Sequence, residues 1–289
     1  MAPSLATLCL RIPGAATLRD IFTSTHPFPQ APSVHQPSAS RPDPYCTVLP
    51  LHLTRPEGQW RAWLGILSPP GPGLPTDPGA FLNGDEMAVY EAFAHPGRRQ
   101  AHLAGRYLAK RVLGAYLREE HPERIAIGVG VFGQPLVVYP ADPAAAVSIS
   151  HAYGWAAALA FHAGHPMGVD LERVTPGAKA VIAPQATGYE RRLYRPGQED
   201  ESVFYTRLWT IKEALSKVLR TGLMTPLQLF EVEAIHPVPG GTESTFRNFI
   251  QYKAISFACK DQICTIVLPR NSDCQLPQEL LRTGQVLPQ

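Results

Sequence analysis

Two carboxylates separated by one residue, Asp170 and Glu172, have a spacing that suggests chemistry. They lie in the stretch Gly168-Val169-Asp170-Leu171-Glu172. Because side chains alternate between the faces of a strand, both carboxylates would project from one face while Val169 and Leu171 are buried on the other. Neighbouring carboxylates repel each other unless a cation or a proton separates them, and their oxygens suit Mg²⁺ or Mn²⁺. The pair predicts a metal site; the alternative is an edge strand whose acidic residues face water.

A long helix is predicted over residues 203–220, and it carries further charged side chains. Its apolar residues follow the 3-4 spacing of a buried face: Phe204, Leu208, Ile211, Leu215 and Val218. Glu213 and Lys217, spaced i,i+4 on another face, can form a surface ion pair worth about 0.3–0.5 kcal/mol. Alternatively, Glu213 completes a three-carboxylate metal site while Lys212 and Lys217 contact phosphate oxygens. Periodicity does not choose between these two interpretations.

Basic residues recur every four positions along another predicted helix, residues 98–119. The row consists of Arg98, His102, Arg106 and Lys110, with Arg99 and Arg111 beside it. Like charges on one helix face cost a few tenths of a kcal/mol per pair, which a bound anion would offset. The turn Ser148-Ile149-Ser150-His151 adds hydroxyls and an imidazole that can also bind phosphate. The row predicts a phosphate site or, alternatively, a solvated helix face.

The composition excludes several classes of protein. The chain has 289 residues and a net charge of +2, from 26 Lys+Arg against 24 Asp+Glu. That charge is too small for general nucleic-acid binding. No apolar run approaches the ~18 residues of a membrane span. The five cysteines include no CxxC pair, so neither a disulfide framework nor a zinc site is indicated, and we expect a cytoplasmic protein.

Proline marks the first division of the chain, because 15 of the 30 prolines fall between Pro3 and Pro78. Proline lacks the amide donor and disfavours helix in the preceding residue. We therefore expect residues 1–44 to form a proline-rich, poorly ordered extension, with a targeting peptide as the alternative.

The remaining chain alternates between strand and helix patterns. A further helix is expected at 85–93, and strands at 47–53, 61–67, 125–132, 136–139, 147–150, 155–161, 167–173, 230–234, 246–259 and 263–268. The two sets of elements divide near residues 162–165. The expected fold class is α/β (α+β), with an N-terminal half at 45–163 and a C-terminal half at 164–289.

Several of these motifs, taken in chain order, resemble the signatures of Sfp-type (group II) 4′-phosphopantetheinyl transferases. The motifs are Gly133-Gln134-Pro135, Ser148-Ile149-Ser150-His151, Gly168-Val169-Asp170-Leu171-Glu172 and Trp209-Thr210-Ile211-Lys212-Glu213-Ala214-Leu215-Ser216-Lys217, followed by Gly222-Leu223. The upstream segment 99–106 is similar to the basic helix of the siderophore-synthetase branch, which includes enterobactin synthetase component D. The resemblance covers roughly residues 95–225, less than half of the chain.

The resemblance implies a pseudo-dimer of two similar α/β halves, with coenzyme A and Mg²⁺ bound between them. Such enzymes transfer the phosphopantetheine arm of coenzyme A to a serine of an acyl or peptidyl carrier protein and release 3′,5′-ADP. It also implies a monomer without nucleic-acid or membrane partners. Carried over by position, the metal ligands are Asp170, Glu172 and Glu213, and the catalytic residues are Glu213 and Lys217. The implied coenzyme A contacts are Arg98, Arg106, Lys110, Gln134, Ser150, His151, Lys212 and Lys217.

Some positions depart from the pattern of the family. Gln134 replaces the lysine of the Gly-Lys-Pro turn, and Ser148 stands where asparagine is common. The helical segment usual between Glu172 and Trp209 is interrupted by prolines and glycines. Within it, Arg191, Arg192 and Arg195 are hypothesised to attract the acidic helix of a carrier protein.

Two alternative functions use the same residues. One is a metal-dependent phosphohydrolase acting on coenzyme A-like pyrophosphates, and the other is a non-catalytic interaction protein with ordinary charged surfaces. A carrier-dependent product would separate the first from a transferase, and Mg²⁺-dependent stabilisation by coenzyme A would exclude the second.

Overall fold

The computed structural model describes residues 45–69, 74–75 and 77–283. The chain divides into two compact units, Met1–Ala39 and Ser40–Gln289, and every described residue belongs to the second. The predicted proline-rich extension, residues 1–44, lies outside the described residues. Within the described part, no helix combines the length and apolarity needed to cross a membrane.

The first sheet is antiparallel and has the strand order β12-β1-β2-β6-β5. Its strands are β1 (Cys46–Arg55), β2 (Gly58–Leu67), β5 (Ala145–Ala152), β6 (Trp155–His162) and β12 (Asp273–Cys274). Between β2 and β5 the chain forms α2 (Gly84–Ala92), α3 (Pro96–Leu117) and a hairpin of β3 (Ala126–Val129) and β4 (Pro135–Tyr139). Short 3-10 turns lie at Pro78–Ala80 and Pro122–Arg124.

The second sheet is also antiparallel, with the order β7-β11-β10-β9-β8. Its strands are β7 (Gly168–Arg173), β8 (Val232–Val238), β9 (Gly241–Phe246), β10 (Tyr252–Cys259) and β11 (Gln262–Pro269). The helices of this part are α4 (Ala178–Ile182), α5 (Gly188–Arg191), α6 (Glu201–Leu219) and α7 (Gln278–Thr283). Additional 3-10 turns lie at Ala183–Gln185, Gly222–Met224 and Leu227–Phe230.

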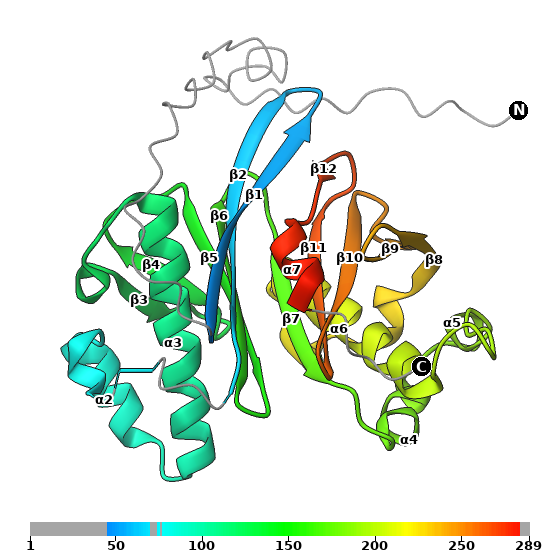
Figure 1. Cartoon of the computed structure of the whole chain (residues 1–289), viewed down its shortest axis with the longest axis horizontal. Coiled ribbons are helices and arrows are strands. Elements are labelled where there is room, and N and C mark those ends of the chain that lie inside the picture. Colours follow the sequence, from blue (N-terminus) through cyan, green and yellow to red (C-terminus); the bar gives the residue numbers. More distant parts are fainter. Residues whose placement is uncertain (1–44, 70–73, 76, 284–289) are drawn as a thin grey trace, which may run out of the picture. The chain divides into compact units, whose positions relative to one another are not determined.

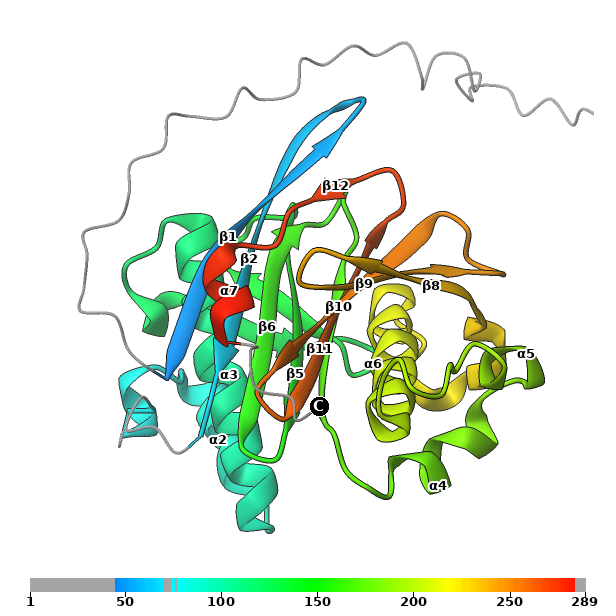
Figure 2. The same cartoon turned by 45° about the vertical axis from the view of Figure 1, so that its right-hand side comes forward.

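Three hydrophobic clusters hold these layers together. The inner faces of the two sheets share one cluster, which includes Leu64, Leu159, Leu171 and Ile266. The outer face of the first sheet packs on α3, and the outer face of the second packs on α6. Figures 1 and 2 show α3 beside the first sheet and α6 beside the second. The predicted α/β fold class is therefore confirmed, with a long helix on the outer face of each sheet.

Serine side chains join the two sheets where the edge strands β5 and β7 meet. Ser148 Oγ accepts a hydrogen bond from the Val169 amide at 3.1 Å, and Ser150 Oγ accepts one from the Leu171 amide at 3.2 Å. Both hydroxyls therefore satisfy backbone donors of an edge strand that would otherwise be buried without partners.

Most predicted elements are confirmed, but three differences have local causes. The single strand expected at 246–259 is wrong, because residues 247–251 form a reversal between β9 and β10, closed by a hydrogen bond from the Tyr252 amide to Phe249 O. The strand expected at 125–132 ends at Val129, since the Gly130 amide bonds back to Gln134 O in a turn. The tail contributes β12 and α7, which the sequence patterns did not predict.

Candidate active site

Asp170 lies in the middle of β7, on the face opposite the core between the sheets. Val169 and Leu171 are buried in that core, so strand alternation directs Asp170 towards α6. Asp170 Oδ1 accepts hydrogen bonds from Ser150 Oγ at 2.7 Å and from Lys217 Nζ at 2.8 Å. Lys217 Nζ also donates to Val169 O at 3.0 Å. One buried carboxylate therefore connects β5, β7 and α6.

Two further carboxyls respond to the charge of Asp170. Burial raises the pKa of Glu213 on α6 to about 7, and the negative charge of Asp170 adds to this shift. Burial likewise raises the pKa of Glu172, with Asp170 again contributing in the same direction. The three carboxyls predicted to bind metal are thus electrostatically coupled.

The chemistry of these donors fits a divalent cation, because hard oxygen ligands suit Mg²⁺ and a cation would relieve their mutual repulsion. Nevertheless, among the described residues no group of three or more His, Cys, Asp or Glu side chains is arranged to hold a metal ion. The metal site of Asp170, Glu172 and Glu213 stays a prediction, and in the structure Lys217 supplies the positive charge beside Asp170.

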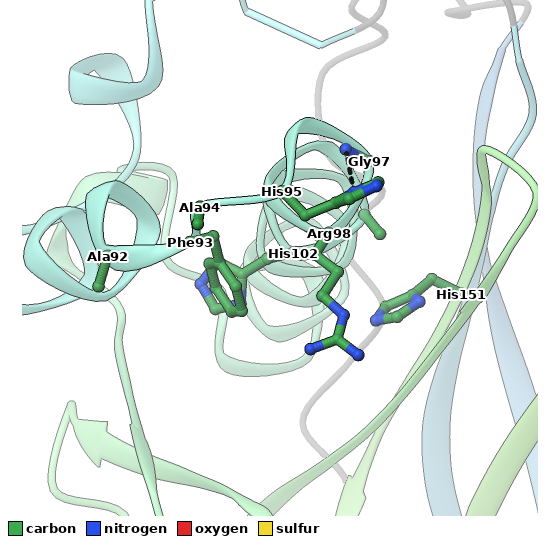
Figure 3. Close-up of a pocket in the computed structure, with 9 residues that line it drawn as sticks. Ala92, Phe93, Ala94, His95, Gly97, Arg98, His102 and His151 are labelled. Atoms are coloured by element: carbon green, nitrogen blue, oxygen red, sulfur yellow. Dashed lines mark hydrogen bonds between the residues drawn. The ribbon is translucent and has the colours of Figure 1, made fainter.

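A cavity of about 930 Å³ opens where α2 meets α3, near the end of β5. Its lining includes Phe93, His95, Arg98, His102 and His151. Figure 3 shows the Arg98 guanidinium between the rings of Phe93 and His102 on one side and His151 on the other. The structure therefore brings the predicted residues Arg98 and His151 together at one cavity.

Unpaired nitrogen atoms lie on the same face of α3. Arg106 is 8% exposed, and its Nη1 atom has no hydrogen-bond partner; the same holds for His102 Nε2. Burial, reinforced by the charge of Arg106, lowers the pKa of His102 to about 4. Burial also lowers the pKa of His151. A buried guanidinium nitrogen without a partner is costly, and an anion beside Arg106 would supply an acceptor.

Two lysines assigned to coenzyme A by resemblance are buried in ion pairs instead. Lys110 Nζ lies 2.5 Å from Glu86 Oε2, and Lys212 Nζ lies 2.7 Å from Glu190 Oε2. The side chains of Lys110 and Lys212 are 0% and 2% exposed. These placements argue against direct phosphate contacts, because neither ammonium group is presented to a ligand.

Gln134 and Ser150 do not line the α2–α3 cavity, although the resemblance groups them with Arg98 and His151 as coenzyme A contacts. Gln134 Oε1 accepts a hydrogen bond from the Phe132 amide at 3.0 Å, within the β3–β4 turn. Gln134 lines a second cavity of about 420 Å³, whose lining also includes Lys217. Ser150 bonds to Asp170, whereas its neighbour His151 lines the α2–α3 cavity, since adjacent strand residues face opposite sides.

Sequence reasoning missed the two glutamates that bind the buried lysines. Glu86 and Glu190 are 4% and 0% exposed. Each occupies the third position of a short helix and completes a capping box, with Asn83 and Thr187 as the respective N-caps. The patterns Asn-x-x-Glu and Thr-x-x-Glu were a visible signal for these helix starts.

The three arginines predicted to attract a carrier protein lie on and just after α5, and all three are exposed. Arg191 Nη1 donates to Ala183 O at 3.0 Å, and Arg195 Nη1 donates to the carbonyl of Arg192. The Arg192 guanidinium lies 5.8 Å from the centre of the Tyr189 ring. All three side chains are thus exposed, and these contacts are with residues 183–194.

Comparison with known proteins connects this site to a family. Residues 166–267 match the model of the 4′-phosphopantetheinyl transferase superfamily. This range includes β7, α6, β8, β9, β10 and most of β11. The chain is 29% identical over 181 residues to 4′-phosphopantetheinyl transferase HetI of Nostoc sp., covering 60% of this chain and 74% of that protein.

Two relatives from Bacillus subtilis match over shorter stretches. A 4′-phosphopantetheinyl transferase is 32% identical over 115 residues, covering 38% of this chain and 48% of the relative. The transferase Sfp of strain 168 is 26% identical over 155 residues, covering 53% of this chain and 66% of the relative. Residues 166–267 are therefore a domain of the 4′-phosphopantetheinyl transferase superfamily, and the chain is an enzyme that resembles the Sfp type.

Proposed function

We propose that the protein transfers the 4′-phosphopantetheine arm of coenzyme A to a serine of an acyl or peptidyl carrier protein, and that it requires Mg²⁺. Two features support this proposal. Asp170 and Lys217 meet beside Glu213, and Arg98 lines the α2–α3 cavity. A ligand with two separated anionic groups matches this arrangement. Coenzyme A is such a ligand, since it carries a 3′-phosphate and a pyrophosphate.

In the proposed binding mode, the α2–α3 cavity holds the 3′-phosphate end of coenzyme A. Arg98 lines the cavity, and Arg106 has an unpaired buried nitrogen on the same helix. Burial lowers the pKa of His151, and an adjacent phosphate would raise it. These contacts are charge-assisted, so they supply both affinity and orientation.

The proposed reaction forms a bond between the serine Oγ of the carrier and the phosphorus atom that bears the pantetheine arm. The bond from that phosphorus to the ADP oxygen breaks, and 3′,5′-ADP leaves. Glu213 accepts the serine proton directly or through one water molecule, a role worth roughly 10²–10⁴-fold in rate. Because its pKa is near 7, Glu213 is poised to exchange protons at neutral pH. Lys217 stabilises the charge that develops on the departing ADP.

A divalent ion held by Asp170, Glu172 and Glu213 would neutralise the pyrophosphate and polarise the phosphorus that is attacked. In the structure, Lys217 Nζ offsets the negative charge of Asp170. Ser150 holds the same oxygen and fixes the orientation of the carboxylate.

Three finer assignments belong to this proposal. Residues 45–163 and 164–289 form the two halves of a pseudo-dimer, supported by the long helix that each sheet carries on its outer face. The exposed arginines Arg191, Arg192 and Arg195 receive the acidic surface of the carrier protein. The protein acts as a cytoplasmic monomer without nucleic-acid or membrane partners.

The proposal is tested by incubating the protein with coenzyme A, Mg²⁺ and a panel of apo carrier proteins, and measuring coenzyme A-derived products. Release of 3′,5′-ADP only when a carrier is present supports the transferase. Release of phosphate or nucleotide at the same rate without a carrier identifies a phosphohydrolase instead. No product and no Mg²⁺-dependent stabilisation by coenzyme A would leave a non-catalytic protein.

A further inference from the structure

The buried ion pair of Lys212 and Glu190 connects α6 to two other segments. Glu190 Oε2 accepts hydrogen bonds from Lys212 Nζ at 2.7 Å and from the Thr187 amide at 2.8 Å. Glu190 Oε1 accepts one from the Val232 amide at 2.8 Å, and Lys212 Nζ donates a second bond to Leu227 O at 3.0 Å. The pair thereby ties the middle of α6 to the start of α5 and the start of β8.

The pair of Lys110 and Glu86 repeats this arrangement on α3. Glu86 Oε2 lies 2.5 Å from Lys110 Nζ and accepts a hydrogen bond from the Asn83 amide at 3.1 Å. Glu86 Oε1 accepts one from the Ile127 amide at 3.1 Å, and Lys110 Nζ donates to Phe81 O at 2.5 Å. This pair ties the middle of α3 to the start of α2 and to β3.

The two arrangements correspond group by group. In each, a capping-box glutamate at the third position of a short helix binds a lysine in the following long helix. In each, the same glutamate accepts a hydrogen bond from a backbone amide of the strand that follows the long helix. The lysine also donates a hydrogen bond to a backbone carbonyl. The carbonyls differ in place, because Phe81 precedes α2 whereas Leu227 follows α6.

Electrostatics explains why neither lysine is free for a ligand. Burial lowers the pKa of Lys212, and the charge of Glu190 opposes that shift. Burial likewise lowers the pKa of Lys110, opposed by Glu86. Removing either ammonium group from its glutamate to reach a phosphate would leave a buried carboxylate unpaired, which is strongly unfavourable.

We propose that Glu190 and Lys212 are positioning residues for the transfer reaction, and the inference rests on the proposed function. Lys212 directly precedes Glu213 and lies just over one helical turn before Lys217. Because α6 rotates and translates as one body, anchoring Lys212 fixes how Glu213 and Lys217 face Asp170. Neither Glu190 nor Lys212 contacts the substrate.

Chemical labelling of the wild-type protein tests the burial of Lys212 without any substitution. The native protein is treated with an amine-acetylating reagent, with and without coenzyme A and Mg²⁺, and labelling of each lysine is followed by peptide mass spectrometry. We expect slow acetylation of Lys212 and Lys110 under both conditions, whereas Lys217, whose side chain is 27% exposed, reacts and is protected by coenzyme A. Lys212 reacting as fast as Lys217 would overturn the inference, whatever coenzyme A does. Absence of protection at Lys217 counts against the proposed function alone.

Matched double variants then separate positioning from phosphate binding. In Glu190→Gln/Lys212→Met, we expect kcat to fall at least about tenfold, because Glu213 and Lys217 lose their alignment in the transition state. KM for coenzyme A should stay within about twofold, because no contact with bound coenzyme A is removed. The control, Glu243→Gln/Lys253→Met, removes an ion pair between β9 and β10, so kcat should stay within about twofold. A rise of about tenfold in KM for coenzyme A at unchanged kcat in the first variant would instead identify Lys212 as a ligand contact. Should the variants not fold, the labelling experiment still decides whether Lys212 is accessible to coenzyme A, and an accessible Lys212 overturns the inference.

Discussion

Lys217 Nζ lies 2.8 Å from Asp170 Oδ1, at the point where α6 meets β7 and β5. The same carboxylate oxygen accepts a hydrogen bond from Ser150. A carboxylate held by an ammonium and a hydroxyl is fixed in orientation, and the ammonium can also bind the phosphate of a ligand. This contact is the centre of the proposed active site, and each prediction below depends on the groups around it.

Replacing Asp170 with Asn is expected to lower kcat at least about 100-fold, because the carboxylate charge that binds cations is lost. Asparagine retains an acceptor for Ser150 and Lys217, so the melting temperature should change little. Steady-state transfer assays and thermal unfolding measure the two quantities. A variant with wild-type kcat would remove Asp170 from the active site.

Gly168 permits the close approach of β7 to α6. A Cβ atom at this position would lie 2.4 Å from Ala214 O and 2.9 Å from Val218 Cγ2. Gly168→Ala is therefore expected to destabilise the fold by about 1–3 kcal/mol, as overpacking does. It should also lower kcat, since Lys217 and Glu213 would move away from Asp170.

The matched control for that change is Gly177→Ala. A Cβ atom at Gly177 has no neighbour within 4 Å, and its φ of −87° suits any residue. Urea unfolding should show little loss of stability in the control. Equal losses in the two variants would show that the contact between β7 and α6 is not tight.

Glu213→Gln is expected to stabilise the protein while abolishing transfer. The pKa of Glu213 in the folded protein, about 7, lies above its ordinary value of 4.5. Ionisation therefore disfavours the folded state: stability is fully present below pH 4.5 and is lost as the pH rises through about 7. Glutamine avoids this loss, so the variant should be more stable than wild type by about 1–3 kcal/mol at pH 8 in the absence of Mg²⁺.

The difference between wild type and Glu213→Gln should shrink to near zero at pH 4.5, when both side chains are neutral. Denaturant unfolding at a series of pH values measures it. A difference that is independent of pH would contradict a raised pKa for Glu213.

Burial of His165 is expected to make stability depend on pH in the opposite direction to Glu213. Its side chain is 2% exposed, and its Nε2 atom lies 2.7 Å from Ser272 Oγ. Burial, with the nearby charge of Arg55, lowers the pKa of His165 from 6.5 to about 4. The stability associated with neutral His165 is therefore present above pH 6.5 and is lost as the pH falls towards 4.

Replacing His165 with Asn should flatten the loss of stability between pH 6.5 and 4, whereas replacing the exposed His52 with Asn should leave the profile unchanged. Thermal unfolding across this pH range distinguishes the two variants. A wild-type-like profile in His165→Asn would assign the acid sensitivity to another group, such as His102.

Local patterns in the sequence predicted the scaffold because they reflect local physics. Alternation in β7 directed Asp170 and Glu172 away from the core, and the apolar stripe of α6 was recognisable from its spacing. The reversal at residues 247–251 was missed because apolar residues on both sides continue the strand pattern through it.

Tertiary pairing explains what the sequence could not reveal about the site. The residue patterns around Lys110 and Lys212 showed that each lysine lies on a helix. They did not show that a glutamate 24 residues before Lys110, or 22 residues before Lys212, would neutralise the lysine. Likewise, Ser148 and Ser150 were interpretable as phosphate contacts until the structure placed them against β7. Such partners are brought together by packing, which no local periodicity encodes.

The most direct test of the central claim is the intact mass of an apo carrier protein after incubation with coenzyme A, Mg²⁺ and either wild type or one of two variants. Asp170→Asn removes the carboxylate at the site, and Asp85→Asn removes an exposed carboxylate on α2 as the control. We expect a gain of one phosphopantetheine arm with wild type and Asp85→Asn, and none with Asp170→Asn in the same time. A full gain with Asp170→Asn, or no gain with wild type on any carrier, would contradict it.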